Sequence, residues 1–163
     1  MLNFFKQLFQ SKTPNAALTW QQAGHAPNNA FWIFALPVHL VLQRDTFSLA
    51  EPVPLTLDNS EIDALTNTLN SHFKPHGCEF FWHENQWLLS LTVDPHIQTS
   101  APKLAINKDI SAFLPTGIGA KKWASFINEV QMLLFEHPVN IAREGVHKPV
   151  INSLWCYGLS QLK

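Results

Sequence analysis

Charged residues are scarce in this sequence. Asp, Glu, Lys and Arg make up 14% of the 163 residues, against about 25% in an average globular domain. The formal net charge is −1, so no basic field extends over the chain to hold a phosphate backbone. We therefore expect no nucleic-acid partner, and regulation through DNA contact is the least favoured of the functions that the sequence suggests.

Cysteine is also scarce, since Cys78 and Cys156 are the two in the chain. Two cysteines are too few for a four-cysteine zinc site or a disulfide scaffold, so we expect reduced thiols packed as small hydrophobic residues. The pattern His-Glu-x-x-His is missing, and Pro75 stands between His72 and His76, whose spacing would otherwise suit a helical metal site. We predict no metal site and no cofactor.

Long hydrophobic runs are missing as well. No stretch approaches the roughly 20 apolar residues that a membrane-spanning helix needs. The first ten residues are apolar but interrupted by Lys6 and two glutamines, which differs from the pattern of a secretory signal. We predict a cytoplasmic protein. Residues 1–29 are expected to form a short helix followed by an irregular connection, and one face of the helix carries Leu2, Phe5, Leu8 and Phe9.

Apolar residues make up 46% of the chain, which is enough for a core. Residues 30–163 are predicted to form a single α+β domain with elements in the order β-α-β-β-α-β. This order indicates a mixed or antiparallel sheet with helices packed on one face. The expected strands cover residues 31–42, 46–49, 78–83, 87–93 and 149–155, and the expected helices cover residues 59–74 and 119–137.

Several local signals support the boundaries of these elements. Asp58 and Glu61 have the spacing of a capping box at the start of the first helix, and Pro75 with Gly77 ends it. Pro138 ends the second helix, which places His137 at a helix C-terminus where the dipole favours its charged form. Pro37 in the first strand requires an edge position, a bulge or a bend.

Polar side chains with binding chemistry concentrate near the C-terminal end, and a second group flanks the first strand. Arginine binds carboxylates or phosphates through paired hydrogen bonds, and asparagine and serine both donate and accept. Such residues equally often hold loops to a sheet, and this structural alternative stays open. The candidate ligand-binding residues are His39, Arg44, Asp45, His137, Asn140, Arg143, Asn152, Ser153 and Trp155.

Motifs in the same region resemble a bacterial family of RpfE-type regulatory proteins. The similarity spans about residues 30–158. The first strand shows Leu36 where the family has an aspartate, and Cys156-Tyr157-Gly158-Leu159 replaces a Trp-Gly-rich ending. The matching motifs are Pro37-Val-His-Leu40, Arg44-Asp45, Leu114-Pro-Thr-Gly117, Asn128-Glu-Val-Gln-Met-Leu-Leu134, His137-Pro-Val-Asn140, Arg143-Glu144 and Asn152-Ser-Leu-Trp155.

The C-terminal motifs also resemble part of the archaeal-type cofactor-independent phosphoglycerate mutases, which are metal-dependent enzymes of the alkaline phosphatase type. The chain is similar to their smaller, inserted domain and is too short for the metal-binding core. The resemblance implies a non-catalytic regulatory or interaction protein with an unknown protein partner. The alternative is a binding module for phosphorylated small molecules, or a phosphoglycerate-mutase-like enzyme, in which Arg44 and Arg143 hold the anion.

Overall fold

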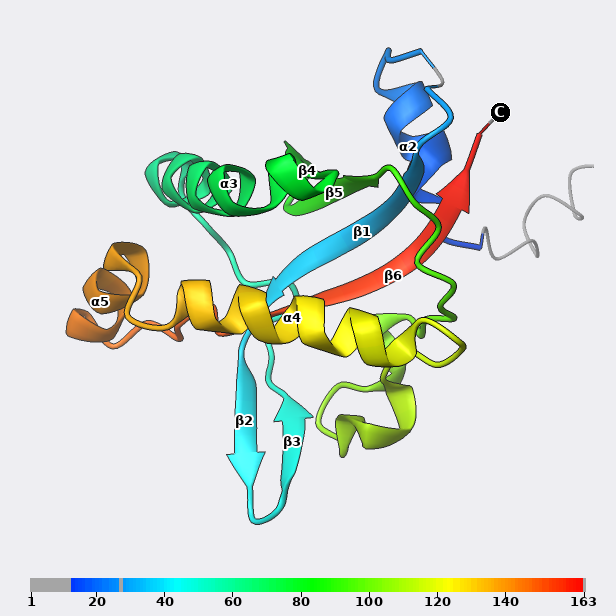
Figure 1. The fold of residues 1–163 in the computed structure, drawn as a ribbon. Helices are drawn as coiled ribbons and strands as arrows, with labels where there is room; N and C mark the ends of the chain where they lie inside the picture. The colour runs from blue at the N-terminus through cyan, green and yellow to red at the C-terminus, as the bar shows by residue number, and fades with distance from the viewer. Residues whose placement is uncertain (1–12, 27, 163) are drawn as a thin grey trace, which may run out of the picture.

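A four-stranded antiparallel sheet lies at the centre of the computed structural model, which describes residues 13–26 and 28–162 (Figure 1). Its strand order is β4-β5-β1-β6, formed by Cys78–His83, Gln86–Leu91, Phe31–Val38 and Ser153–Gln161. The helices are α2 (Ala16–Gln22), α3 (Asn59–Phe73), α4 (Ala120–Leu134) and α5 (Pro138–Gly145). Short 3₁₀ helices cover Lys74–His76 (η1), Pro102–Leu104 (η2) and Ile110–Phe113 (η3). The predicted α+β class is confirmed.

The central strand β1 explains why residues 31–38 are almost continuously apolar. Ile33 and Ala35 face the core beneath α3 and α4. Trp32 and Phe34 point to the opposite face, where they pack against α2. Because neighbouring side chains alternate between faces, a strand covered on both sides must be apolar throughout. Helices α3 and α4 share one face as predicted, and α2 and η3 add a second covered face.

Helix α2 corrects the expectation of an irregular connection before residue 30. Asn15 caps the helix, since its side chain accepts a hydrogen bond from the N–H of Leu18. Ala16 and Ala17 are buried against the sheet. A seven-residue helix with a single turn of buried alanines lacks the periodic apolar pattern that identifies longer helices. The short helix expected over residues 2–9 lies outside the described residues.

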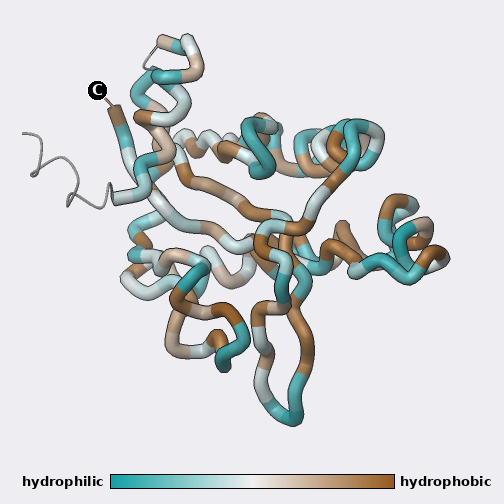
Figure 2. Tube along the Cα trace, turned by 180° about the vertical axis from the view of Figure 1, so that it is seen from behind, coloured by the Kyte–Doolittle hydropathy of each residue, from teal (hydrophilic) through white to brown (hydrophobic). Residues whose placement is uncertain are grey.

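The expected first strand divides at His39 into β1 and a separate hairpin. This hairpin consists of β2 (Leu40–Gln43) and β3 (Thr46–Leu49) and projects away from the main sheet (Figure 1). Its tip is hydrophilic (Figure 2). Pro37 lies beyond the last residue of β1 that pairs with β5, so its missing N–H removes no bond to β5. Its carbonyl accepts from the N–H of Leu55 instead.

Helix α3 begins and ends as predicted. The carboxylate of Asp58 accepts from the N–H of Glu61, and the Glu61 carboxylate accepts from the N–H of Asp58. The first of these bonds, with a second from Ser60, holds the pKa of Asp58 below its usual value. Gly77, with φ of 83°, ends the helical segment in the left-handed conformation that glycine adopts readily.

The C-terminal elements differ from the prediction in two ways. Helix α4 ends at Leu134, and Pro138 begins a separate helix, α5, because proline is favoured at a first helical position. Strand β6 starts at Ser153 and continues to Gln161. Gly158, with φ of 72°, lies where the pairing of β1 with β6 shifts register. A bulge of this kind lets a strand continue through a glycine.

No helix in the described ranges is both long and apolar enough to cross a lipid bilayer.

Candidate functional site

The segment of residues 149–152, between α5 and β6, is held by side chains that the sequence analysis placed in a binding site. Arg143 donates from Nε to the Pro149 carbonyl at 2.7 Å. His39 Nδ1 lies 2.8 Å from the Val150 carbonyl. Asn152 binds both backbone groups of Leu40, at 2.7 and 2.9 Å. The structure therefore brings Arg143, His39 and Asn152 together as contacts of one connecting segment.

Asn140 lies at the centre of this segment's contacts and is buried. Its side-chain amide donates to the carbonyls of Leu134 and Ile151, at 2.9 and 2.8 Å. Its Oδ1 accepts from the N–H of Ile151 at 2.8 Å. One side chain therefore satisfies the end of α4 and both backbone groups of Ile151. The geometry makes Asn140 a link between α4, α5 and the start of β6.

Arg143 is buried and forms an ion pair with Glu61. Its Nη1 lies 2.9 and 3.0 Å from the two carboxylate oxygens. Because Glu61 also caps α3, the pair connects α5 to the start of that helix. The guanidinium has a further contact with the Thr56 carbonyl at 3.4 Å. These contacts use Nε and Nη1, and Glu61 already supplies the counter-charge, so a phosphate would have to compete with this carboxylate for the guanidinium.

His137 is a correction to the expected helix C-terminus, since it is the N-cap residue of α5. Its Nδ1 accepts from the N–H of Val139 at 3.1 Å, so this nitrogen carries no proton. The other nitrogen then carries it and donates to the Thr68 hydroxyl at 2.9 Å. Burial lowers the pKa of His137. The structure therefore favours the neutral ring, where the sequence analysis expected the charged form.

Acidification is expected to destabilise the protein through His137. Its pKa in the folded state lies below the unfolded value of 6.5. The unfolded chain therefore binds more protons as the pH falls below about 6.5, and stability present above that pH is lost until the folded pKa is passed. Urea unfolding between about pH 7.5 and pH 5 measures this loss. His137→Gln should show a smaller decline than the wild type.

The matched control for this titration is His147→Gln, because His147 is exposed. It should keep the wild-type pH dependence. Equal declines in the wild type and in His137→Gln would show that His137 does not carry the effect.

Ser153 and Trp155 are buried in β6 and also have partners. The Ser153 hydroxyl accepts from Gln131 at 3.1 Å. The Trp155 indole donates to the Ser100 carbonyl at 2.9 Å.

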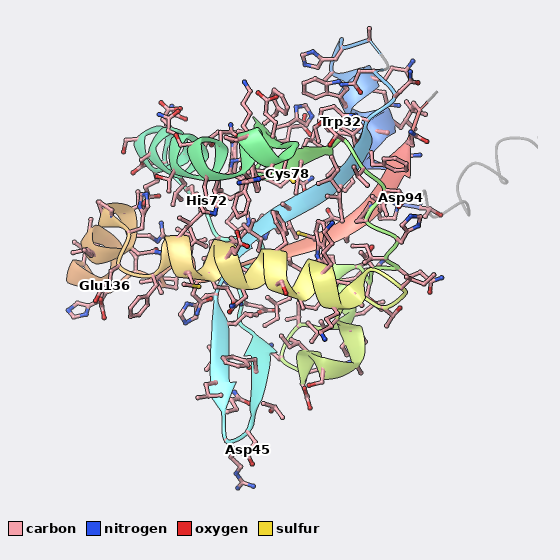
Figure 3. The ribbon with its side chains drawn as sticks, viewed as in Figure 1. Trp32, Asp45, His72, Cys78, Asp94 and Glu136 are labelled. Carbon is pink, nitrogen blue, oxygen red and sulfur yellow. The ribbon has the colours of Figure 1, made fainter. Side chains whose placement is uncertain are left out.

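Arg44 and Asp45 lie far from the other candidate residues, at the exposed tip of the β2–β3 hairpin, where Figure 3 shows Asp45. The structure thus separates these two residues from the others, and ligand binding by the set as a whole stays a prediction.

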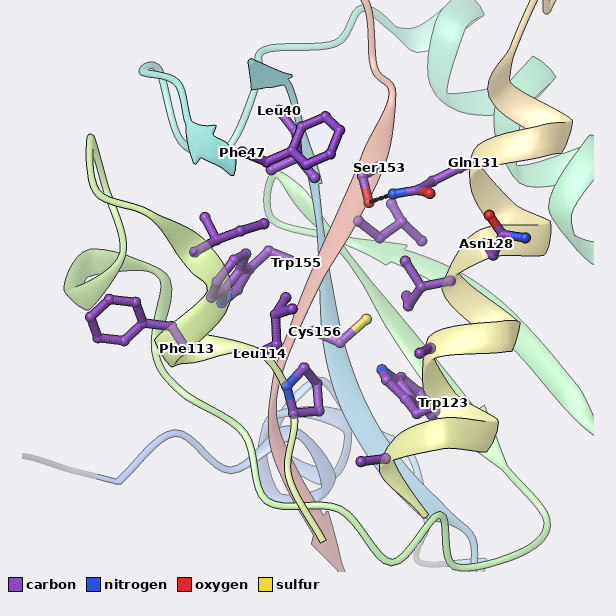
Figure 4. A pocket seen from close by; sticks show the side chains of 16 residues that line it. Leu40, Phe47, Phe113, Leu114, Trp123, Asn128, Gln131, Ser153, Trp155 and Cys156 are labelled. Atoms are coloured by element: carbon purple, nitrogen blue, oxygen red, sulfur yellow. Dashed lines mark hydrogen bonds between the residues drawn. The ribbon is translucent and has the colours of Figure 1, made fainter. Parts of the chain in front are cut away.

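A groove beside this polar network consists of two adjoining cavities. The first, which we call the α4–β6 cavity, has a volume of about 390 Å³ (Figure 4). The second, the α5–hairpin cavity, has a volume of about 550 Å³. Leu40, Phe47 and Gln131 line both. The α4–β6 cavity falls within the roughly 300–1,000 Å³ typical of ligand pockets and has no charged residue in its wall.

Trp123 of α4 contributes a buried polar group to the α4–β6 cavity, which is also lined by the polar residues Asn128, Gln131 and Ser153. Its side chain is almost completely buried, at 6% exposure. Its indole N–H has no hydrogen-bond acceptor within the part of the chain that the structure describes. Figure 4 shows the indole nitrogen directed into the cavity. A buried donor without an acceptor costs about 1–3 kcal/mol, and a bound molecule with an acceptor would remove that cost.

Cys156 also lines the α4–β6 cavity but is unsuited to nucleophilic chemistry. Burial raises the pKa of its thiol to about 12. The reactive thiolate is therefore negligible at neutral pH. Burial also raises the pKa of Cys78. Both cysteines are free, and Cys156 is buried as the sequence analysis expected.

Sequence reasoning missed the groove, although it placed Trp123 on the apolar face of the long helix. Helical periodicity identifies that face but does not show whether an acceptor meets the indole N–H. Phe47 gave a weak sequence signal for the groove, since it is an aromatic residue in a short strand beside a polar turn.

In residues 13–26 and 28–162, no three His, Cys, Asp or Glu side chains lie close enough to hold a metal ion.

No protein-family model matches this chain, and no curated protein matches it either. Among solved structures, the chain is similar to a cofactor-independent phosphoglycerate mutase from Thermoplasma acidophilum DSM 1728. The TM-score is 0.57 at 15% sequence identity, and the match covers 83% of this chain and 38% of that enzyme. The chain therefore has the fold of part of a phosphoglycerate mutase and spans well under half of its length.

Proposed function

We propose that this chain is a non-catalytic, cytoplasmic regulatory protein that acts by binding another protein, and that it belongs with the RpfE-type family. The chain shares its fold with part of a phosphoglycerate mutase, and this distant relation agrees with the proposal. At 15% identity the relation extends to the fold alone. The activity of that enzyme is not carried over to this chain, because function depends on the site rather than the fold.

The observation that carries the proposal is the exposed apolar wall of the groove. Phe47, Phe135 and Ile141 line the α5–hairpin cavity and are 46%, 76% and 59% exposed. Leu114 lines the α4–β6 cavity and is 47% exposed. Large apolar residues that gather around a continuous groove are typical of protein-binding surfaces.

The alternative, a site for phosphorylated metabolites or for mutase chemistry, has less support. Arg143, the expected anion-binding residue, is already paired with Glu61. Arg44, the other expected anion-binding residue, lies at the tip of the hairpin. The described residues do not place these two guanidinium groups around one cavity.

Phe47→Asp is expected to abolish partner binding, because it puts a carboxylate between the two cavities. The matched control is Leu42→Asp. Leu42 faces Phe47 across the same hairpin and is 62% exposed, but it lines neither cavity. Affinity capture from extracts of the source cells, with mass spectrometry, should identify a partner that the wild type and Leu42→Asp retain. Phe47→Asp should retain less than a tenth as much.

Two results would contradict the proposed function. One is a partner retained equally by all three proteins, which would place its binding surface elsewhere. The other is turnover of 2- or 3-phosphoglycerate by the purified wild-type protein, lost in an Arg143→Ala variant that still folds.

A further inference from the structure

The α4–β6 cavity encloses the free edge of strand β6. Strand β6 is the last in the order β4-β5-β1-β6, so only β1 pairs with it. The consecutive residues Ser153, Leu154, Trp155 and Cys156 all line the cavity. Neighbouring side chains in a strand point to opposite faces. A cavity that touches all four therefore surrounds the strand edge and includes its backbone.

The backbone groups of Leu154 point toward this edge. Leu154 faces Pro37 of β1. Pro37 has no N–H to donate, and its carbonyl accepts from Leu55. Leu154 and Pro37 therefore form the pair without mutual hydrogen bonds, which directs the N–H and C=O of Leu154 away from β1. Because hydrogen-bonded and non-hydrogen-bonded pairs alternate along an antiparallel ladder, the N–H and C=O of Cys156 also point away from β1.

These outward groups have no backbone partner. Among the residues that the structure describes, no backbone group outside β1 is hydrogen-bonded to β6. The unpaired indole N–H of Trp123 is directed into the same cavity. The cavity thus offers alternating backbone donors and acceptors, the indole N–H of Trp123, the side-chain amides of Asn128 and Gln131, and a mainly apolar wall. A peptide backbone in an extended conformation complements this set, whereas a purely apolar ligand would leave every polar group unsatisfied.

We propose that the free edge of β6 binds an extended segment of the partner protein as an added strand, with one of its carbonyls accepting from Trp123 Nε1. This inference rests on the proposed function and specifies its partner. Apolar side chains at alternate positions of the segment fill the α4–β6 cavity. The strand then passes Phe47 into the α5–hairpin cavity, because Leu40, Phe47 and Gln131 line both.

The charges of the groove specify the partner segment further. Glu136 and Glu144 line the α5–hairpin cavity and are its charged lining residues. Both are exposed. An apolar, extended segment followed by lysine or arginine would have matching charge at this end, which favours its association and fixes its direction. We therefore infer a partner segment of alternating apolar and polar residues that is followed by basic residues.

The test uses the full-length protein and a synthetic peptide in which leucine and threonine alternate before two lysines. Hydrogen exchange followed by NMR should show slower exchange of the Leu154 and Cys156 amides with peptide bound. The Trp123 indole N–H resonance should shift downfield. A second peptide carries N-methyl groups on the alternate residues whose backbone N–H groups point toward β6, and it should bind at least tenfold more weakly. The matched control is a peptide N-methylated on the other alternate residues, whose N–H groups point away from β6.

Trp123→Phe isolates the contribution of the indole N–H, because it keeps an aromatic ring in the α4–β6 cavity. It should weaken peptide binding by about two- to tenfold, the loss expected for one hydrogen bond. A peptide with glutamates in place of the lysines should bind more weakly than the basic one. This difference should shrink in the Glu136→Gln/Glu144→Gln variant.

Other outcomes would overturn the inference. Unchanged exchange at Leu154 and Cys156 with peptide bound would exclude strand addition. Slow exchange of both amides in the free protein would mean that another segment of this chain or a second copy already occupies the edge. A partner captured in a Phe47-dependent manner that leaves both amides unprotected would contradict strand addition and leave the proposed function standing. Peptide protection without any Phe47-dependent partner would contradict the proposed function instead.

Discussion

Arg143→Met is expected to lower the free energy of unfolding by about 3–5 kcal/mol, as found when one partner of a buried ion pair is removed. The Arg143 and Glu61 side chains are only 5% and 14% exposed. Methionine would leave the Glu61 carboxylate without its counter-ion and the Pro149 carbonyl without its donor. Urea unfolding at neutral pH measures the change.

The control for this change is Arg44→Met, at the exposed tip of the hairpin. It removes the same charge and should alter stability by less than about 0.5 kcal/mol. The double variant Arg143→Met/Glu61→Met should recover part of the loss, because it also removes the unpaired carboxylate. A stability near the wild type for Arg143→Met would mean that the arginine does not hold the fold and is free for a ligand.

Asn140→Ala is expected to cost about 3–4 kcal/mol. The substitution removes hydrogen bonds to Leu134 and Ile151 in a buried site. Each buried backbone group left without a partner costs about 1–3 kcal/mol. Alanine is the better helix former, so helix propensity offsets only a few tenths of a kcal/mol. Thermal or urea unfolding gives the difference directly.

Asn67→Ala is the matched control, since Asn67 is an exposed asparagine inside helix α3. It should leave stability unchanged or raise it slightly. If the two asparagine variants are equally stable, the three hydrogen bonds of Asn140 do not contribute as the structure implies. A large loss for Asn140→Ala alone would confirm that the C-terminal polar residues hold residues 149–152 in place.

These stability tests bear directly on how the polar residues near the C-terminus are interpreted. The sequence offers the same residues to a ligand or to the fold, because arginine and asparagine suit both. The structure supplies partners for His137, Asn140, Arg143 and Asn152 within the chain. These partners are backbone groups together with the Thr68 hydroxyl and the Glu61 carboxylate. The groove beside them, whose wall is mainly apolar, is where we propose that a partner binds.

The sequence by itself determined the α+β class, the start of α3, the β4–β5 hairpin and the apolar face of α4. These features depend on local chemistry: the Asp58–Glu61 cap, alternating strand residues and helical periodicity. It did not separate α4 from α5, because Pro138 both ends one helix and favours the start of another. For the same reason the sequence placed His137 at a helix C-terminus, whereas it is the N-cap residue of α5.

Only the tertiary structure decided which polar groups have partners. Three features depend on residues distant in sequence: the hydrogen bond that Leu55 N–H donates to the Pro37 carbonyl, the pair of Arg143 with Glu61, and the unpaired indole of Trp123. No local pattern encodes whether an acceptor meets a donor across the fold. The free edge of β6 likewise follows from the strand order, which arises when β1 pairs with β5 and β6. For this reason the groove is a property of the folded chain alone.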